Sequence, residues 1–577
     1  MEDTSIFKRA LFRYTWFPLT NALVALSVLL AGVSGGCGHR LSPGPVLPAP
    51  ITPPLRFTDT AAASGLIYRW TVPGKHPLNI LQTIGNGCAF LDYDNDGNLD
   101  ILLVGPKLAL YKGDGHGHFA DVTHQTGLDR FSGHFLGCAV GDYDGDGFDD
   151  IYISGYHTGL LLHNQGGERF TDATVSAGLK PQMWGTSCAW AETVPGSGRL
   201  DLFIGNYADF GSDPKKYQQL CESGGKMTSC GPRYYKPAHD VLYQNLGGGR
   251  FFDISAAAGV SSATGKTLGV ACAPLDAARA PYIAVANDEM PGDLLRPTLT
   301  AGQARYTNIG STSGTAFDRD GNIHGGMGTD WADYDNDGKF DLFVATFQHE
   351  AKSLYHNDGG EQFTDNTYRA GLGTATLPRL TFGVKFADFA NAGWLDVMTA
   401  NGHVQDNIEQ IDSSTTYRQA TQLFQNIDGH FVDRSESAGP ALLKPIVGRG
   451  LAVGDFDNDG RVDALVVDSE GAPLLLHNDS APVGHWISLR LIGTRSNRDG
   501  YGAIVRVTAG GLTQTRLCHA DGSYLSSSDR RVHVGIGGAR AIDKISITWP
   551  SGHTDTITNV LVDRVMTFRE GQRMSGR

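Results

Sequence analysis

Four short segments of the sequence are crowded with aspartate, and their spacing is the pattern of an oxygen-rich metal site. Each places carboxylates at its first, third, fifth and ninth positions. These are Asp92, Asp94, Asp96 and Asp100; Asp142, Asp144, Asp146 and Asp150; Asp333, Asp335, Asp337 and Asp341; and Asp455, Asp457, Asp459 and Asp463. Four like charges within nine residues repel one another strongly unless a cation lies among them. Flexible oxygen ligands suit calcium better than magnesium or zinc, so we expect about four calcium ions.

The sixth and seventh positions of these aspartate loops support the same interpretation. Glycine stands at every sixth position, which lets the chain turn sharply around an ion. The seventh position varies freely, as expected if only its backbone carbonyl binds the ion; its residues are Asn98, Phe148, Lys339 and Arg461. A set of solvated turns rich in Asp and Gly is the alternative.

An EF-hand loop opens in a similar way, but it needs a glutamate at position 12. That position holds Leu103, Ile153, Val344 and Val466, which belong to apolar runs typical of strands. The sequence therefore excludes the EF-hand and favours a calcium ion that holds a turn between two strands.

The net charge agrees with a structural role for calcium. The chain has 61 acidic and 47 basic residues, for a net charge of −14. Four divalent ions would cancel more than half of that charge. The acidic balance also argues against a general affinity for nucleic acid, and no nucleic-acid partner is expected.

The aspartate loops belong to a longer repeat. Asp142 follows Asp92 by fifty residues, and each loop is followed by an apolar run, a short run ending near Asn, and an aromatic-x-Asp/Asn segment that closes on Gly. Weaker copies at 191, 273 and 387 bring the number of units to seven. The 75 glycines and the 19% of charged residues fit a turn-rich, all-β protein. We expect a seven-bladed β-propeller of four-stranded blades over residues 55–482.

The order of these segments predicts how the ring closes. The last unit lacks an aromatic segment of its own, and the seventh copy, RFTDTAAASGL at 56, stands before the first aspartate loop. Pairing the N-terminal strand into the final blade would leave no exposed sheet edge.

The three weaker aspartate loops are expected to be free of metal. The sixth keeps Asp388 and Asp396 at its ends but has Ala390 and Ala392 in the middle, and the third and fourth retain mainly Asp201 and Asp276. Too few carboxylates remain to surround a hard cation.

Beyond the repeats, residues 483–571 alternate as strands without any aspartate loop, and residues 572–577 form a tail. Within residues 483–571, the strings at Ser496–Ala503, Ser523–Gly537 and Trp549–Gly552 resemble the hallmark strings of the ASPIC/UnbV domain. We expect this domain to be β-sandwich-like. The aspartate loops resemble those of FG-GAP/VCBS propellers. GMGTDWADYDNDG at 326 and ANGHV at 400 resemble recurring strings of the cartilage acidic protein-like family. This resemblance implies calcium binding and an extracellular location, and it brings no established reaction.

The N-terminus has the organisation of an export signal over residues 1–37. Lys8, Arg9 and Arg13 precede a largely apolar stretch, and small residues then lead to Cys37. This arrangement resembles a bacterial lipoprotein signal with Cys37 as the lipidated residue, although Ser34 stands where the lipobox prefers a branched apolar residue.

Two alternatives for this segment remain open: a cleaved ordinary signal, and an uncleaved anchor, because about 20 apolar residues span a bilayer. All three place the protein outside the cytoplasm, in the periplasm, at the cell surface or anchored to the membrane. Residues 38–54, which are rich in proline, are expected to be a linker.

The cysteines fall into two groups. Four stand at equivalent places before the loops, where we expect small buried thiols rather than a metal cluster; they are Cys88, Cys138, Cys188 and Cys272. Cys221 and Cys230 lie in a polar insertion between the third and fourth units, and an oxidising compartment predicts a disulfide between them. Cys518 is expected to be a lone thiol.

Other polar residues give weaker signals. His403 precedes a polar loop that could border a ligand site, but a histidine bonded to loop backbone is the simpler interpretation. His163, His356 and His477 each precede an Asn at the end of an expected third strand and are interpreted as part of the turn. SNRDGYGA lacks the Lys-Ser/Thr ending of a phosphate loop, and no GxSxG or HExxH motif occurs.

Two classes of function follow from the sequence. The first is a calcium-stabilised binding, adhesion or scaffold module at the cell envelope with a protein or glycan ligand. The second is a secreted enzyme acting on polysaccharide or a small metabolite, with its site at the channel mouth. The second class requires Asp, Glu, His or Arg side chains from several blades to converge on one face, apart from the aspartate loops.

Overall fold

The protein is described by a computed structural model that covers residues 54–211, 219–275, 280–481 and 484–572. Residues 52–577 form one compact unit. The expected export signal, Cys37 and most of the expected linker lie outside the described residues. Within the described part of the chain, no helix is both long enough and apolar enough to cross a membrane.

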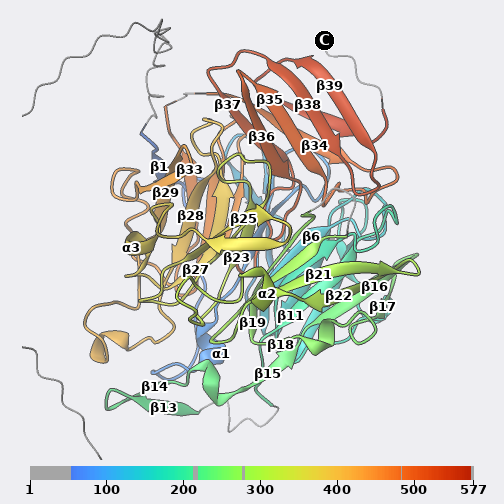
Figure 1. The fold of residues 1–577 in the computed structure, drawn as a ribbon. Helices are drawn as coiled ribbons and strands as arrows, with labels where there is room; N and C mark the ends of the chain where they lie inside the picture. Colours follow the sequence, from blue (N-terminus) through green and yellow to red (C-terminus); the bar gives the residue numbers. More distant parts are fainter. Residues whose placement is uncertain (1–53, 212–218, 276–279, 482–483, 573–577) are drawn as a thin grey trace, which may run out of the picture. The chain divides into compact units, whose positions relative to one another are not determined.

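The described residues between 54 and 481 form seven antiparallel four-stranded sheets, which follow one another along the sequence (Figure 1). In chain order, the first sheet contains β2 (Cys88–Leu91), β3 (Asp100–Leu103), β4 (Ala109–Gly113) and β5 (Phe119–Asp121); the second contains β6 (Phe135–Gly141), β7 (Asp150–Gly155), β8 (Thr158–Asn164) and β9 (Phe170–Asp172); and the third contains β10 (Gly185–Ala191), β11 (Asp201–Asn206), β16 (Val241–Gly247) and β17 (Arg250–Asp253). The fourth contains β19 (Thr267–Ala273), β20 (Tyr282–Asn287), β21 (Asp293–Thr300) and β22 (Gln303–Asn308), and the fifth contains β23 (Thr329–Ala332), β24 (Asp341–Val344), β25 (Ser353–Gly359) and β26 (Gln362–Asp365). The sixth contains β27 (Thr381–Ala387), β28 (Asp396–Asn401), β29 (Gln422–Ile427) and β30 (His430–Asp433), and the seventh contains β31 (Gly448–Gly454), β32 (Asp463–Asp468), β33 (Leu474–Asn478) and β1 (Phe57–Asp59).

The first strands of these sheets surround a common centre. They contact one another in the order β2, β6, β10, β19, β23, β27 and β31, and β31 contacts β2 again. The last sheet takes its outer strand from the N-terminus, with Phe57 opposite Asn478. This is the pairing that the displaced aromatic segment at residue 56 predicts. The all-β propeller architecture expected from the sequence is confirmed.

The inner strands are buried at every position, which explains their small and apolar side chains. Cys88, Cys138, Cys188 and Cys272 lie on four of these strands as buried free thiols. Burial raises the pKa of the Cys88 thiol to about 12, so it stays protonated and packs as a small apolar group.

An insertion follows β11 in the third sheet. Its strands are β12 (Ala208–Asp209), β13 (Leu220–Ser223), β14 (Lys226–Ser229) and β15 (Lys236–His239), with β18 (Thr264–Gly265) pairing to β15. Strands β13 and β14 form a hairpin, and a disulfide joins Cys221 to Cys230 across it. The described helices are short: α1 (Ile80–Thr83), α2 (Gly310–Ser313) and α3 (Gly373–Thr376).

The C-terminal domain consists of two sheets with a shared apolar core. One contains β37 (Val532–Gly537), β34 (His485–Ile492) and β40 (Arg564–Arg569), and the other contains β36 (Leu512–Leu517), β35 (Ile504–Ala509), β38 (Ile542–Thr548) and β39 (Thr554–Val560). Leu489, Val507, Ile545 and Phe568 belong to one buried cluster, so the two sheets pack face to face as a sandwich.

Between β36 and β37, residues 518–531 form a central loop that enters the ring of inner strands. Its residues 521–529 make hydrogen bonds with the first strand of every sheet: Ser527 with Phe90 in β2, Leu525 with Cys138 in β6 and Ser187 in β10, Asp521 with Cys272 in β19 and Lys385 in β27, Ser523 with Thr329 in β23, and Asp529 with Val453 in β31. Tyr524 is fully buried and donates from its hydroxyl to Ile84 O over 2.9 Å. The approach is so close that a Cβ at Gly87 would lie 1.7 Å from Leu525 O.

Candidate metal centre

Each complete aspartate loop joins the first strand of a sheet to the second. Asp92–Asp100 connects β2 to β3, and the other three connect β6 to β7, β23 to β24, and β31 to β32. The four loops therefore occupy equivalent places at the same end of the inner strands. The ligand assignments in these loops stay predictions.

The first and ninth carboxylates hold the turn itself. Gly147 N–H donates to Asp142 over 2.8 Å, and the same contact recurs in the seventh sheet between Gly460 and Asp455 over 2.9 Å. Asp150, at the ninth position, accepts the N–H groups of Tyr143 and Asn164. These bonds fix the loop whether or not an ion is present.

The sixth sheet shows how much of this turn survives without the middle carboxylates. Asp388 accepts the Gly393 N–H over 2.7 Å, and Asp396 accepts the Phe389 and Asn426 N–H groups. Carboxylates at the third and fifth positions are therefore what distinguishes a complete loop.

The fourth position of the loops is a turn residue that the sequence analysis missed. Asn95, Asn336 and Asn458 have φ between 57° and 58°, and Gly145 has φ 81°. Asparagine and glycine tolerate this left-handed conformation better than other residues. The signal in the sequence was the recurrence of Asn or Gly one place before the carboxylate at the fifth position, which could have predicted this left-handed turn residue.

Three histidines lie against the third and fifth carboxylates, which extends their interpretation as turn residues. His477 Nε2 is 2.9 Å from Asp457 Oδ2, and His356 Nε2 is 3.0 Å from Asp335 Oδ2. His163 Nδ1 lies 3.4 Å from Asp144 Oδ2. At the equivalent place in the first sheet, Lys112 pairs with Asp94 and Asp96.

The corresponding residue differs in two sheets whose loops are incomplete. Gln244 precedes Asn245 in the third sheet, and Gln425 precedes Asn426 in the sixth. A basic or imidazole side chain thus accompanies the middle carboxylates, where it offsets part of their charge.

Burial disfavours the charged form of several loop carboxylates. Burial raises the pKa of Asp100 to about 8 and that of Asp142 to about 8, in the latter case with a further contribution from Asp499. Burial also raises the pKa of Asp455 to about 7, although Arg531 opposes the increase. A divalent cation would favour the charged carboxylates and reverse these shifts.

The residues present fit a hard cation. Asp333 is 1% exposed, and its Oδ1 has no hydrogen-bond partner among the described residues; Asp457 Oδ1 is also buried and unpartnered. Each complete loop contributes to a group of three side chains whose ligand atoms lie within 4.8 Å of one another. These groups are Asp92, Asp94 and Asp96; Asp144, Asp146 and His163; Asp335, Asp337 and His356; and Asp457, Asp459 and His477. Buried carboxylate oxygens without donors are suitable ligands for calcium.

The incomplete loop of the third sheet keeps the turn bonds of the complete loops. In the third sheet, Glu192 accepts the Gly198 N–H over 3.0 Å, and Asp201 accepts the Asn245 N–H over 2.7 Å. Asp276, from the fourth loop, lies outside the described residues.

The C-terminal domain places arginines at the first aspartates of the loops. Arg490 Nη1 lies 3.3 Å from Asp92 Oδ2, and Arg498 Nε lies 3.6 Å from Asp142 Oδ2. Arg531 donates to Asp455 O over 2.8 Å. The loops therefore form part of the contact between the propeller and the C-terminal domain.

The remaining polar candidates are structural in their surroundings. Burial lowers the pKa of His403 to about 3, and its Nδ1 accepts the Gln405 N–H. In SNRDGYGA, Asp499 accepts the Asp142 N–H over 2.7 Å, and Asn497 donates to Glu192. That segment docks on the propeller.

Comparison with known proteins confirms both resemblances drawn from the sequence. Residues 493–575 match the family described as ASPIC and UnbV, and residues 92–153 and 333–399 match the FG-GAP-like repeat. Cartilage acidic protein 1 of Xenopus tropicalis is 26% identical over 522 residues, which cover 83% of this chain and 72% of the relative. Its counterpart in Mus musculus is 25% identical over 516 residues, with the same coverage of 83% and 72%.

Solved structures with a related chain course are more distant. A lectin of Agrocybe aegerita that recognises non-reducing terminal N-acetylglucosamine is 14% identical, with a TM-score of 0.37, and the match covers 67% of this chain and 86% of the lectin. An exotype rhamnogalacturonan lyase is 11% identical, with a TM-score of 0.32 and coverage of 86% and 92%. Scores this low carry no inference about ligand or reaction.

Proposed function

We propose that this chain, which combines FG-GAP-like repeats with an ASPIC and UnbV domain, is an exported, calcium-stabilised binding module. Calcium has a structural role in this proposal, and the four complete aspartate loops hold it. The unpartnered, buried Asp333 Oδ1 is the observation that carries the assignment. The extracellular location rests on the resemblance to the cartilage acidic protein-like family and on the export signal.

The residues of each loop have distinct tasks in this proposal. The first and ninth carboxylates hold the backbone turn with part of their oxygen atoms. Together with the third and fifth carboxylates and the seventh carbonyl, they also face the ion. A bound calcium ion supplies positive charge and accepts six to eight oxygen ligands. Because the arginines of the C-terminal domain contact the same loops, the ion also stabilises the contact between the two domains.

The test combines elemental analysis with thermal unfolding. Protein equilibrated with calcium is expected to retain about four ions and to melt at a higher temperature than chelator-treated protein, because a ligand at a hundred times its Kd stabilises the folded state by about 2.7 kcal/mol per site. An unchanged melting temperature, or metal-free protein after exposure to calcium, would refute the assignment.

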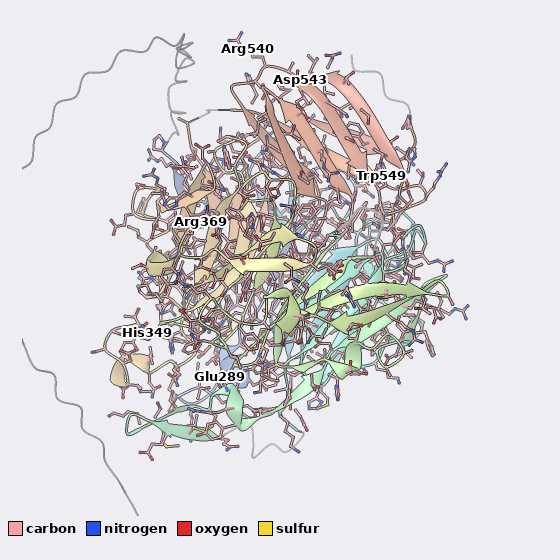
Figure 2. All side chains as sticks on the ribbon, in the orientation of Figure 1. Glu289, His349, Arg369, Arg540, Asp543 and Trp549 are labelled. Carbon is pink, nitrogen blue, oxygen red and sulfur yellow. A yellow bond between two sulfur atoms is a disulfide. The ribbon has the colours of Figure 1, made fainter. Side chains whose placement is uncertain are left out.

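Matched variants locate the effect in the loops. Asp335→Asn with Asp337→Asn should remove one ion and reduce the calcium-dependent shift in melting temperature by roughly a quarter. Asp543→Asn changes an exposed aspartate in the C-terminal domain, labelled in Figure 2, and should leave both unchanged. Equal losses in the two proteins would argue against the loops as the binding sites.

Binding of a protein or glycan of the cell envelope is the activity that we propose for the module. The partner can be sought by screening glycan arrays and envelope extracts with calcium-replete protein. Saturable binding that disappears on chelation and returns with calcium would support the proposal. Failure to bind any component in either screen would oppose it.

A secreted enzyme remains the second candidate because of one observation. Asp288 and Glu289 follow β20 in the fourth sheet, and Glu350 follows β24 in the fifth; all three line one cavity. This is the convergence of acidic groups from different blades that the enzyme hypothesis requires. Turnover of a polysaccharide or small metabolite, abolished by Asp288→Asn without loss of melting temperature, would establish it over simple binding.

A further inference from the structure

A cavity of about 230 Å³ lies away from the aspartate loops, at the opposite end of the inner strands. Leu268 and Phe382, which line it, stand at the second positions of β19 and β27, whereas the aspartate loops follow the last positions of such strands. The hairpin of β13 and β14 and the helix α1 form further parts of the wall. Glu289, labelled in Figure 2, and Ile80 of α1 both line the cavity.

Acidic side chains supply most of the charge in this cavity. Asp288 is 6% exposed, and its Oδ2 accepts a hydrogen bond from the Tyr207 hydroxyl over 2.7 Å. Among the described residues, no ion pair within 4.0 Å involves Asp288 or Glu289, whereas Glu350 Oε2 lies 3.6 Å from His324 Nδ1. Glu350 accepts the N–H groups of Gly325 and Phe347, which fixes its carboxylate at the rim.

Burial distinguishes Asp288, and an uncommon backbone conformation distinguishes Glu289. Burial raises the pKa of Asp288 to about 7, and Glu289 adds to the increase, although Lys266 opposes it. Glu289 itself has φ 49°, a left-handed conformation that a glutamate rarely adopts. Strained backbone and carboxylates with a raised pKa are both more frequent at ligand sites than elsewhere.

Apolar and aromatic groups form the rest of the wall. Tyr207, Met327, Phe347 and Phe382 all line the cavity and are buried or half-buried. Arg233 is the basic side chain that reaches it, and it is exposed. A wall of apolar side chains beside carboxylates attracts a positively charged group that carries apolar carbon.

We propose that this cavity binds a small organic cation, with an alkylammonium group against Asp288 and Glu289 and an apolar body against the aromatic wall. The site goes beyond the proposed function because it names a ligand class and does not require the aspartate loops to hold calcium. The size of the cavity suits a ligand of a few carbon atoms rather than a folded partner.

Titration calorimetry with choline and with cadaverine tests the proposal, with glucose and glutarate as neutral and anionic controls. All titrations use the full chain with saturating calcium, so that metal exchange at the loops does not contribute heat. At least one cation is expected to bind saturably at one site per chain, and the controls are expected to show no saturable heat. Equal binding of glucose or glutarate, or no binding of either cation, would overturn the proposal.

Variants assign the binding to the cavity. Asp288→Asn keeps the acceptor for Tyr207 but removes the charge, and Glu289→Gln removes the second charge; each is expected to weaken cation binding by about tenfold or more. Glu168→Gln makes the same charge change at an exposed turn between β8 and β9 and should bind like the parent protein. Melting temperature and calcium content confirm that each variant folds. Unchanged cation affinity in both cavity variants would refute the site, whereas loss of calcium with intact cation binding would contradict only the proposed role of the aspartate loops.

Discussion

Lys385 forms an ion pair that joins three parts of the structure. Its Nζ lies 2.8 Å from Asp330 Oδ1 and donates to Asp521 O over 3.0 Å. The pair therefore connects β27 to β23 and to the central loop. The side chains of Lys385 and Asp330 are 4% and 1% exposed, so removing one partner leaves the other charge buried without compensation.

Replacing Lys385 by methionine keeps most of the volume and removes the charge. Breaking a buried ion pair from one side costs about 3–5 kcal/mol. Lys444 offers a matched control because it pairs with Asp59 over 3.1 Å at the surface, where its side chain is 49% exposed. Lys444→Met is expected to cost only about 0.2–1 kcal/mol, as exposed pairs do.

Urea unfolding followed by tryptophan fluorescence, with melting temperature as a second measure, compares the two variants. The double variant Lys385→Met with Asp330→Asn should lose less stability than the sum of its single changes, because no buried charge then remains unpaired. If Lys385→Met costs no more than Lys444→Met, the ion pair does not hold the central loop in the ring.

Three other changes test separate features. Burial raises the pKa of Asp240 to about 8 from an unfolded value of about 3.9. Between these two values the folded state binds one more proton than the unfolded state, so the free energy of unfolding falls as the pH rises from about 4 to about 8. Asp240→Asn should therefore have a higher melting temperature than the parent protein at about pH 8.5 but not at about pH 5. Tyr524→Ala should cost about 3–5 kcal/mol in urea unfolding, and a loss below about 1 kcal/mol would show that the central loop is weakly held. Reduction of the Cys221–Cys230 disulfide, which spans nine residues, should lower the stability of the hairpin by roughly 2–3 kcal/mol, measurable as faster proteolysis of that hairpin alone.

The repeat pattern predicted much of the propeller because it is a local signal. Asp92–Asp100 and its equivalents fall between first and second strands, as expected from the apolar run after each loop. The aromatic segment at residue 56 predicted the pairing of β1 with β33. Each of these inferences needed only short-range order and a count of copies.

The sequence did not predict what enters the ring. The string GSYLSSSD, at residues 522–529, has no periodicity that distinguishes a central plug from a surface turn. Its hydrogen bonds run to residues hundreds of positions away in the sequence, so the segment itself does not encode them. The place of His477 beside Asp457 was missed for a similar reason. A third strand and a loop meet there through the sheet, and neither segment alone encodes the contact.

The central loop also restricts how this chain can change in length. Gene duplication easily adds or removes one unit of a tandem array, and a ring with six or eight sheets would still bury its own strands. Residues 521–529, however, meet one specific strand from each of the seven sheets. Gain or loss of a unit would shift every later partner by one place, so a change in the number of units would also require a change in the central loop.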